Sequence, residues 1–215
     1  MKLILYISLL IAISCDEFPG IDVSEWDEDI DWYTVAENNY FAIIHAGYGT
    51  GNIDEYYEAN YAGAKDAWVK VGSYWYSYAE STDDAVNEAY SFIDALSGKQ
   101  FEWPVYYDIE EQSIFDAGIA SDIARAFCGV LEENRFYCGI CVSDSALENY
   151  LDDDVKTRYT IWLAEWDVPS PTYGGNYDIW QYTVGSTPGV SGDCDLDLGF
   201  LDFEPIMKAN HLNGY

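Results

Sequence analysis

Basic residues are scarce in this chain. Among its 215 residues there are 9 Lys and Arg against 39 Asp and Glu, which gives a formal net charge of −30. Such a charge is repelled by phosphate backbones and anionic lipid surfaces near neutral pH, so nucleic acid is not expected as a partner. The charge favours solubility, and it also suits an acidic compartment, where protonation of carboxylates relieves self-repulsion.

Long apolar runs are lacking as well, except at the start of the chain. Lys2 is followed by an apolar segment that ends in Ala-Ile-Ser at residues 12–14, which fits a small-residue cleavage site. The run is too short to cross a bilayer comfortably, so residues 1–14 predict a signal peptide, with cleavage after Cys15 as a variant. We expect a protein that is secreted or delivered to an acidic digestive compartment (phagosome or lysosome), without stable membrane insertion.

Cysteine is sparse and its arrangement is not that of a metal site. Apart from Cys15 the chain has Cys128, Cys138, Cys141 and Cys194. In a secreted protein these four could form two disulfides, and three pairings are open. Cys138 and Cys141 have CxxC spacing, but they fall in an apparent strand rather than at a helix start, which argues against a redox or zinc role. We predict no metal and no cofactor.

Strand-like and helix-like segments alternate along the rest of the chain. Eight short segments rich in apolar, β-branched and aromatic residues predict strands at 18–24, 41–47, 71–78, 103–110, 137–143, 160–165, 177–183 and 194–198. Helical patterns lie between several of them, at 54–69, 82–96 with Thr82 as cap, and 119–134. Past Thr160 prolines and glycines replace helix. The pattern predicts an α/β fold: an irregular (β/α) barrel of eight strands, with helices reduced or missing on the C-terminal side, in a single domain over residues 15–215.

The segment Trp103 to Glu111 reads WPVYYDIEE and combines an apolar strand with acids at its end. Asp108 and Glu110 are two positions apart, so in a strand they project from the same face. Two neighbouring carboxyls repel each other, and one can stay protonated as a general acid while the other is charged. Cleavage of a glycosidic bond requires such a pair.

Other acids fall at the ends of other predicted strands. Asp22 ends the first, and Asp195 and Asp197 end the eighth, which is the neighbour of the first in a closed barrel. Active sites of parallel barrels lie at the C-terminal strand ends. Acids from three strands gathered at one mouth therefore predict an active site in which Asp22, Asp108, Glu110 and Asp195 point into one cleft.

Seven segments in this order resemble the family-25 glycoside hydrolases. They are 20–26 (GIDVSEW) with 30–32 (IDW), 41–49 (FAIIHAGYG), 72–76 (GSYWY), 104–110 (PVYYDIE), 162–166 (WLAEW), 179–182 (IWQY) and 195–197 (DLD). The resemblance covers almost the whole chain, from Gly20 to about Phe203. It implies a barrel-fold lysozyme, an N-acetylmuramidase that hydrolyses the β-1,4 bond between N-acetylmuramic acid and N-acetylglucosamine in bacterial peptidoglycan, acting as a monomer.

The resemblance also implies roles for individual residues. Glu110 would be the general acid that protonates the leaving oxygen. Asp108 would either orient the 2-acetamido group of the sugar as an internal nucleophile or help to position water. Asp22 and Asp195 would bind substrate and raise neighbouring carboxyl pKa values by like charge. Tyr76, Trp166 and Gln181 are candidates for sugar stacking and hydrogen bonding, with barrel packing as the alternative for the aromatic residues.

Four positions depart from that family's pattern. Asp27-Glu28 stands where Gln-Gly is usual, and His45 where a Lys or Arg is common. His45 is either a neutral core histidine or a modulator that becomes cationic at low pH. Asp197 replaces the usual Asn, which leaves open whether Asp195 or Asp197 is the acid of the last strand.

Competing functions are a chitinase-like glycosidase, a lectin derived from a lysozyme and an acidic calcium-binding protein. A chitinase-like motif would carry further acids upstream on the same strand, where this chain has Pro104 and Tyr106. A relic lectin would be expected to lose the acid, whereas Glu110 is present. The acidic runs at 27–31 and 152–154 lack the spacing of an EF-hand.

Overall fold

The computed structural model describes residues 17–27 and 29–215. The predicted signal peptide and Cys15 lie outside the described residues. Eight helices and nine strands are assigned within them. In this part of the chain, no helix is both long and apolar enough to cross a membrane.

The strands form a closed barrel, as predicted. The sheet order is β1-β9-β8-β7-β6-β5-β4-β2-β3, and β1 also pairs with β2, which closes the ring and leaves β3 outside it. The ring strands are β1 (Phe18–Val23), β2 (Phe41–Tyr48), β4 (Lys70–Tyr76), β5 (Val105–Asp108), β6 (Cys138–Ser143), β7 (Thr160–Ala164), β8 (Ile179–Ser186) and β9 (Asp193–Gly199). The two-residue β3 (Asn52–Ile53) folds back on the end of β2.

The last strand runs against the direction expected in a parallel barrel. Strand β9 is antiparallel to both β8 and β1, whereas the other ring pairs are parallel. Only residues 187–192 connect β8 to β9, and a parallel crossover needs a dozen or more. The short connection therefore forces a hairpin. Asp195 consequently lies near the start of β9, which reaches the same end of the barrel as the C-terminal ends of its neighbours.

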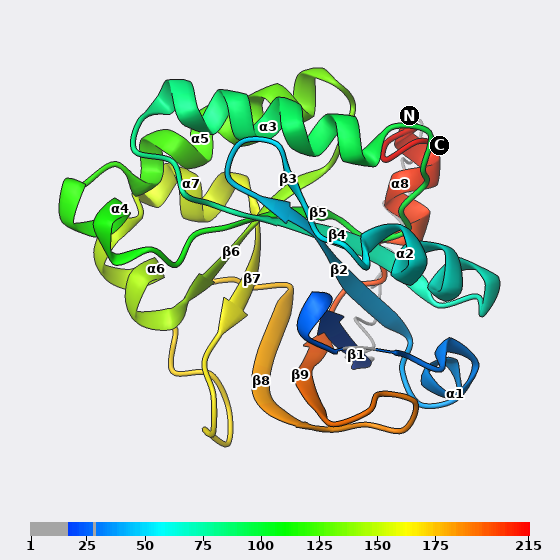
Figure 1. The fold of residues 1–215 in the computed structure, drawn as a ribbon. Helices are drawn as coiled ribbons and strands as arrows, with labels where there is room; N and C mark the ends of the chain where they lie inside the picture. Colours follow the sequence, from blue (N-terminus) through cyan, green and yellow to red (C-terminus); the bar gives the residue numbers. More distant parts are fainter. Residues whose placement is uncertain (1–16, 28) are drawn as a thin grey trace, which may run out of the picture.

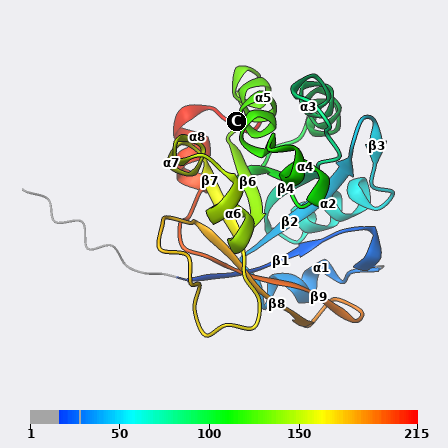
Figure 2. The same cartoon turned by 90° about the vertical axis from the view of Figure 1, so that its left-hand side faces the viewer.

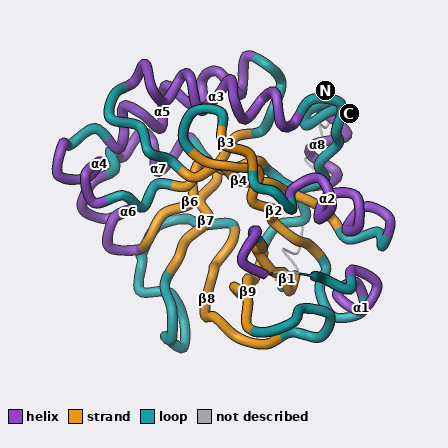
Figure 3. The backbone as a smooth tube through the Cα atoms, viewed as in Figure 1, coloured by secondary structure: helices purple, strands orange, loops and turns teal. Residues whose placement is uncertain are grey.

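Most of the helices lie on one side of the barrel, and the short α1 (Trp32–Ala36) lies beside β1 and β9 on the other (Figures 1 and 2). The two longest, α3 (Thr82–Leu96) and α5 (Ala120–Glu133), lie side by side over the sheet. Other short helices are α2 (Tyr57–Asp66), α4 (Gln112–Ala117), α6 (Asp144–Tyr150) and α7 (Asp153–Arg158). After β7 the chain is strand and loop until α8 (Glu204–Asn210), as Figure 3 shows. The predicted loss of helix on the C-terminal side is thus confirmed.

Predicted and observed helices agree best where the helical periodicity of apolar residues continues over a long segment. Helix α3 has the predicted bounds, although its N-cap is Ser81 rather than Thr82: the Ser81 hydroxyl accepts from the Asp84 backbone N–H at 3.2 Å. The prediction missed α4, α6, α7 and α8, which have six or seven residues each. Segments of under two turns show too little periodicity to be recognised.

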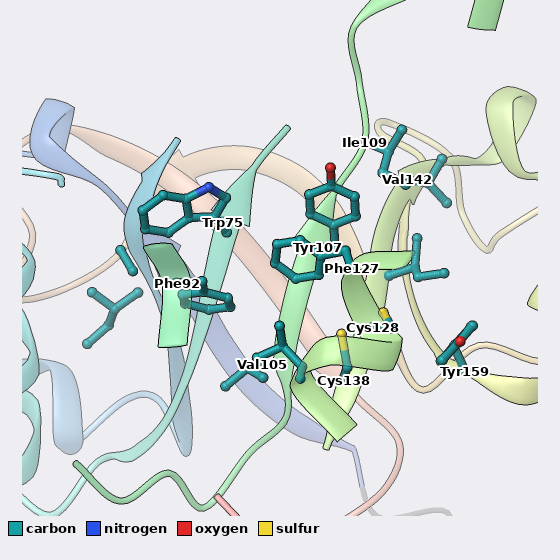
Figure 4. Close-up of a cluster of buried hydrophobic side chains, with 14 of the residues drawn as sticks. Trp75, Phe92, Val105, Tyr107, Ile109, Phe127, Cys128, Cys138, Val142 and Tyr159 are labelled. Atoms are coloured by element: carbon teal, nitrogen blue, oxygen red, sulfur yellow. The ribbon is translucent and has the colours of Figure 1, made fainter. Parts of the chain in front are cut away.

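Aromatic side chains fill the space on both sides of the sheet. Outside the ring, Trp75, Phe92, Tyr107 and Phe127 pack between the strands and helices α3 and α5 (Figure 4). Inside it, the rings of Phe41 and Trp103 stack 3.7 Å apart. Gly199 makes room for this pair, since a Cβ there would lie 2.3 Å from Trp103. One end of the barrel interior is thereby filled by aromatic rings, and the acids of β1 and β9 lie at the other.

The cysteines differ from the prediction of two disulfides. Cys128, Cys138, Cys141 and Cys194 are buried free thiols in the structure. Cys138 and Cys141 are three positions apart on β6, so the strand directs them to opposite faces of the sheet. Cys138 packs with the helices, and Cys141 lies in the interior cluster with Tyr106 and Trp162.

Candidate active site

Five carboxyl groups meet at the open end of the barrel. Strand β1 supplies Asp22, β5 and its following residues supply Asp108 and Glu110, and β9 supplies Asp195 and Asp197. Asp22 is the direct neighbour of Asp195 across the β1–β9 ladder. Asp22, Asp108 and Asp197 are 5%, 6% and 1% exposed, whereas Glu110 is exposed at the rim. The structure thus brings the four acids predicted to share a cleft to one mouth, with Asp197 as a fifth.

The two acids after β5 share a side because of the residue between them. Ile109 is fully buried in the core outside the ring, so Asp108 and Glu110 point the opposite way, toward the mouth. The strand ends at Asp108 rather than at Glu110 as predicted, and the Ser77 backbone N–H donates to the Asp108 carbonyl at 3.0 Å. The β4–β5 ladder therefore fixes the position of this acid pair.

Burial and mutual repulsion raise the pKa values of these acids. Burial raises the pKa of Asp108 well above its usual value, and the charges of Glu110 and Asp195 add to the effect. Desolvation also raises the pKa of Glu110, with Glu111 adding repulsion. The pKa of Asp195 rises to about 6 through burial and the charges of Asp27 and Glu110. Protonated and ionised carboxyls can therefore coexist here, which is the condition for general acid catalysis.

Asp22 is held by a relay of side chains from the neighbouring strands. Gln181 Nε2 on β8 donates to Asp22 Oδ2 at 2.8 Å, and Trp166 Nε1 donates to Gln181 Oε1 at 2.8 Å. Gln181 is 7% exposed, whereas Trp166 is 51% exposed and its ring is open to a ligand. Three of the predicted site residues are thus one hydrogen-bonded unit.

Asp197 lies deeper than Asp195. Its Oδ1 accepts from Trp162 Nε1 at 2.8 Å, whereas its buried Oδ2 has no hydrogen-bond partner. Burial raises its pKa to about 8, opposed by the Trp162 hydrogen bond and increased by the charge of Asp195. Asp195 is the less buried of the two.

Beside the acids lies a cavity of about 370 Å³ with aromatic walls. It is lined by Ser24, Glu25, Trp26, His45, Tyr48, Tyr74, Tyr76 and Tyr78. Tyr76 also donates from its hydroxyl to Glu111 Oε1 at 2.9 Å. Tyr76 and His45 are among the predicted site residues, whereas the other aromatic residues of the cavity are not. The alternation of Tyr74, Tyr76 and Tyr78 at the end of a strand is the sequence signal that points to them.

His45 is neither free nor isolated. Its Nδ1 lies 2.7 Å from Asp54 Oδ2, and Asp54 also accepts from the Glu25 and Tyr56 backbone N–H groups at 2.8 Å each. Asp54 follows β3, and it was missed because its nine-residue separation from His45 has no recognisable spacing. The pair leaves the other side of the imidazole to face the cavity.

The acidic runs considered for calcium have other partners. Asp152 and Asp154 pair with Arg125, and Asp27 accepts from the Ser24 backbone N–H at 2.7 Å. Among the residues described, no group of three or more His, Cys, Asp or Glu side chains is arranged to hold a metal ion.

An α/β barrel whose mouth joins paired carboxyls to exposed aromatic rings has the architecture of a glycoside hydrolase. Comparison with known proteins identifies the group more narrowly. The model of glycosyl hydrolases family 25 matches residues 21–190, and the chain belongs to this family of enzymes.

Relatives and solved structures agree with this assignment. The autolytic lysozyme of Clostridium acetobutylicum is 29% identical over 183 residues, which cover 83% of this chain and 54% of that protein. The chain thus spans about half of the length of that relative. The structure is similar to the CTP1L endolysin, with a TM-score of 0.79, 24% identity and coverage of 89% of this chain and 70% of that one. A family 25 glycosyl hydrolase from Bacillus anthracis has a TM-score of 0.72 at 23% identity, with 89% and 92% covered. These last two likenesses show the shared fold.

Proposed function

We propose that this protein is a lysozyme that hydrolyses the β-1,4 bond between N-acetylmuramic acid and N-acetylglucosamine in bacterial peptidoglycan. The observation that carries the proposal is the pair Asp108 and Glu110, directed into a mouth that holds three further carboxyls. Membership of family 25 and a lysozyme relative support peptidoglycan as the substrate.

Glu110 is the general acid in this proposal. A general acid must keep its proton until the leaving oxygen takes it, and desolvation raises the pKa of Glu110 for that purpose. Its exposed position at the rim gives access to the glycosidic oxygen of a bound chain.

Asp108 assists from deeper in the mouth. Its Oδ1 is buried without a hydrogen-bond partner, so it is free to accept a donor from the substrate. The N–H of a 2-acetamido group is such a donor. Accepting from it would turn the acetamido oxygen toward the anomeric carbon, where it acts as the internal nucleophile.

The remaining site residues bind the glycan. Trp166 offers an exposed ring for sugar stacking, and Gln181 couples it to Asp22. Asp195, on the antiparallel strand β9, accepts hydrogen bonds from sugar hydroxyls. Tyr76 and His45 line the adjoining cavity, where the His45–Asp54 pair presents an imidazole to the next sugar or its peptide.

The compartment follows from charge. A protein of formal charge −30 whose mouth carboxyls have raised pKa values is suited to an acidic surrounding. We propose that it acts after secretion or in a phagosome or lysosome, on bacterial walls and as a monomer.

Glu110→Gln tests the proposal. An amide keeps the shape of the side chain but cannot donate the proton, and such acid–base steps contribute about 10²–10⁴ in rate. We expect a loss of this size in the lysis of a bacterial wall suspension, followed by turbidity with and without chelator, and an unchanged unfolding temperature. Mass spectrometry of the wild-type fragments should find N-acetylmuramic acid at the new reducing ends.

Three results would contradict this assignment. Retention of more than about a tenth of the activity would remove Glu110 from the acid role. New reducing ends on N-acetylglucosamine would assign the other glycosidic bond. Binding to walls without release of fragments would favour a lectin.

A further inference from the structure

Outside the mouth, one buried carboxyl has no counter-charge. Glu88 lies on helix α3, on the outer side of the barrel, and is 1% exposed. Among the residues described, its hydrogen-bond donors are neutral, and the only charge that acts appreciably on it is that of Asp84, another acid. Burying an ionisable group without a cation costs folding free energy, so its position calls for an explanation.

Glu88 joins helix α3 to two strand ends. Its Oε1 accepts from the Tyr78 backbone N–H at 2.9 Å, and its Oε2 accepts from the Tyr107 hydroxyl at 2.6 Å. The Ser77 hydroxyl in turn donates to the Tyr107 oxygen at 2.7 Å. Tyr107 itself is held by stacking on Phe127 of α5, with ring centroids 3.7 Å apart (Figure 4).

The segment that Glu88 holds, residues 77–81, leads from β4 into α3 and contributes Tyr78 to the aromatic cavity beside the acids, which we call the glycan-binding groove. Ser77 donates its backbone N–H to the Asp108 carbonyl, and Ser81 caps α3. Between these fixed points Tyr78 projects outward, 53% exposed. Its ring lies 5.1 Å from that of Tyr76 and 5.8 Å from that of Tyr48, and all three line the aromatic cavity beside the acids.

We propose that Glu88 is a positioning residue of the active site, which fixes the backbone of Tyr78 from helix α3 so that Tyr78 forms a wall of the glycan-binding groove. The inference rests on the proposed function and deepens it. Glu88 does not touch substrate. It acts through the Tyr78 N–H and through Tyr107, the residue that precedes Asp108 on β5.

Glu88→Leu removes both acceptors and keeps an apolar side chain of similar length against the sheet. We expect KM for soluble peptidoglycan fragments to rise about tenfold with kcat within about threefold, because the wall binds the ground state and the transition state alike. Glu88→Gln keeps one acceptor and should restore most of the affinity. Asp94→Leu is the matched control, since it removes an exposed acid from the same helix.

A double-mutant cycle tests whether the effect passes through Tyr78. Tyr78→Ala alone should raise KM. Adding Glu88→Leu should raise KM little further, because the Tyr78 ring that Glu88 positions has already been removed. If Glu88→Leu does not fold, Tyr107→Phe takes its place: it removes one donor to Glu88 and leaves the packing on Phe127.

Amide hydrogen exchange gives a readout that does not depend on hydrolysis. Exchange at the Tyr78 N–H should accelerate at least tenfold in Glu88→Leu and stay unchanged in Asp94→Leu. If the wild type proves inactive on peptidoglycan while this acceleration is seen, the proposed function fails and the positioning role stands. The role is overturned if Tyr78 exchange is unchanged, if KM stays within about twofold of the control, or if the two substitutions act additively.

Discussion

At the scale of single residues, the surroundings of a carboxyl decide its chemistry. A hydrogen bond from the Thr34 side chain lowers the pKa of Asp31 at the start of α1, and hydrogen bonds from Arg125 lower the pKa of Asp154. Burial acts in the opposite direction on Asp22, whose pKa rises well above its usual value, with Asp197 and Asp195 adding repulsion. The described acids thus include surface groups whose pKa is lowered by hydrogen bonds and mouth groups whose pKa is raised by burial.

Asp197 makes stability depend on pH. Its pKa of about 8 in the folded protein stands against 3.8 for a free side chain, so between these values the folded state holds a proton that the unfolded chain has released. Stability must then fall as the pH rises through this window. Asp197→Asn removes that contribution, and its amide oxygen can still accept from Trp162. Thermal unfolding from pH 4 to 9 should show that the unfolding temperature of the variant rises relative to that of the wild type as the pH increases. If the two unfolding temperatures depend on pH in the same way, the raised pKa is contradicted.

Gln181 is a second residue whose substitution should lower activity at the mouth. Gln181→Leu removes the donor to Asp22 and the acceptor for Trp166, and leaving buried polar groups without partners costs about 1–3 kcal/mol. We expect kcat/KM on soluble peptidoglycan fragments to fall about tenfold or more, whereas Gln181→Glu, which keeps an acceptor for Trp166, should retain more of it at acidic pH. Equal activity of Gln181→Leu and the wild type would show that this relay does not serve the reaction.

At the scale of elements, two helices and one hairpin determine the barrel. Helices α3 and α5 bury aromatic residues against β4 and β5, and β5 ends at Asp108, the first acid of the pair. On the other side, the β8–β9 hairpin closes the ring without a helix and brings Asp195 to the mouth from the opposite chain direction. The side with α3 and α5 thus supports the strand before the acid pair, and the β8–β9 hairpin supplies the strand that completes the acid cluster.

Phe127→Ala tests the side with α3 and α5. The ring is fully buried between α5 and β5, and truncation of a buried Phe costs about 3–5 kcal/mol through lost burial and the cavity left behind. Denaturant unfolding should show this loss with an unchanged m value. Tyr90→Ala, an aromatic truncation on α3 at a residue that is 54% exposed, should stay within about 0.5 kcal/mol of the wild type. Similar losses in the two variants would mean that α5 does not pack on the barrel as described.

At the scale of the whole molecule, the negative net charge of the protein weakens its binding to the proposed substrate. Bacterial walls are largely anionic, and a protein near −30 is repelled by them at neutral pH. Acidification removes protein charge and keeps the raised mouth carboxyls protonated. Both effects shift the pH of maximal activity to acidic values.

We therefore expect maximal lysis below about pH 6. At neutral pH, added salt should recover part of the activity, because screening over about 10 Å at 0.1 M weakens the long-range repulsion. Lysis rates across pH 4–8 at two ionic strengths measure both effects, and soluble fragments without anionic polymers serve as the control for charge. A profile that peaks at pH 7 or above in low salt would show that net charge does not control this enzyme.

Local pattern alone determined much of this protein. Short segments rich in apolar, β-branched and aromatic residues placed the eight ring strands. The two-residue spacing of Asp108 and Glu110 put both on one side of Ile109, because strand geometry acts between near neighbours. The amphipathic period of residues 82–96 was long enough to give the bounds of α3. The order of the strands then implied a barrel with its acids at one mouth.

Tertiary structure decided what depends on distant partners. The contact of Gln181 with Asp22 spans 159 positions, and no local signal distinguishes Glu88 from the exposed acids of the same helix. The antiparallel direction of β9 depends on the short turn that connects it to β8. Cys138 and Cys141 are kept apart because they occupy opposite faces of β6. Burial, and with it every raised pKa at the mouth, exists only once strands far apart in the chain exclude water together.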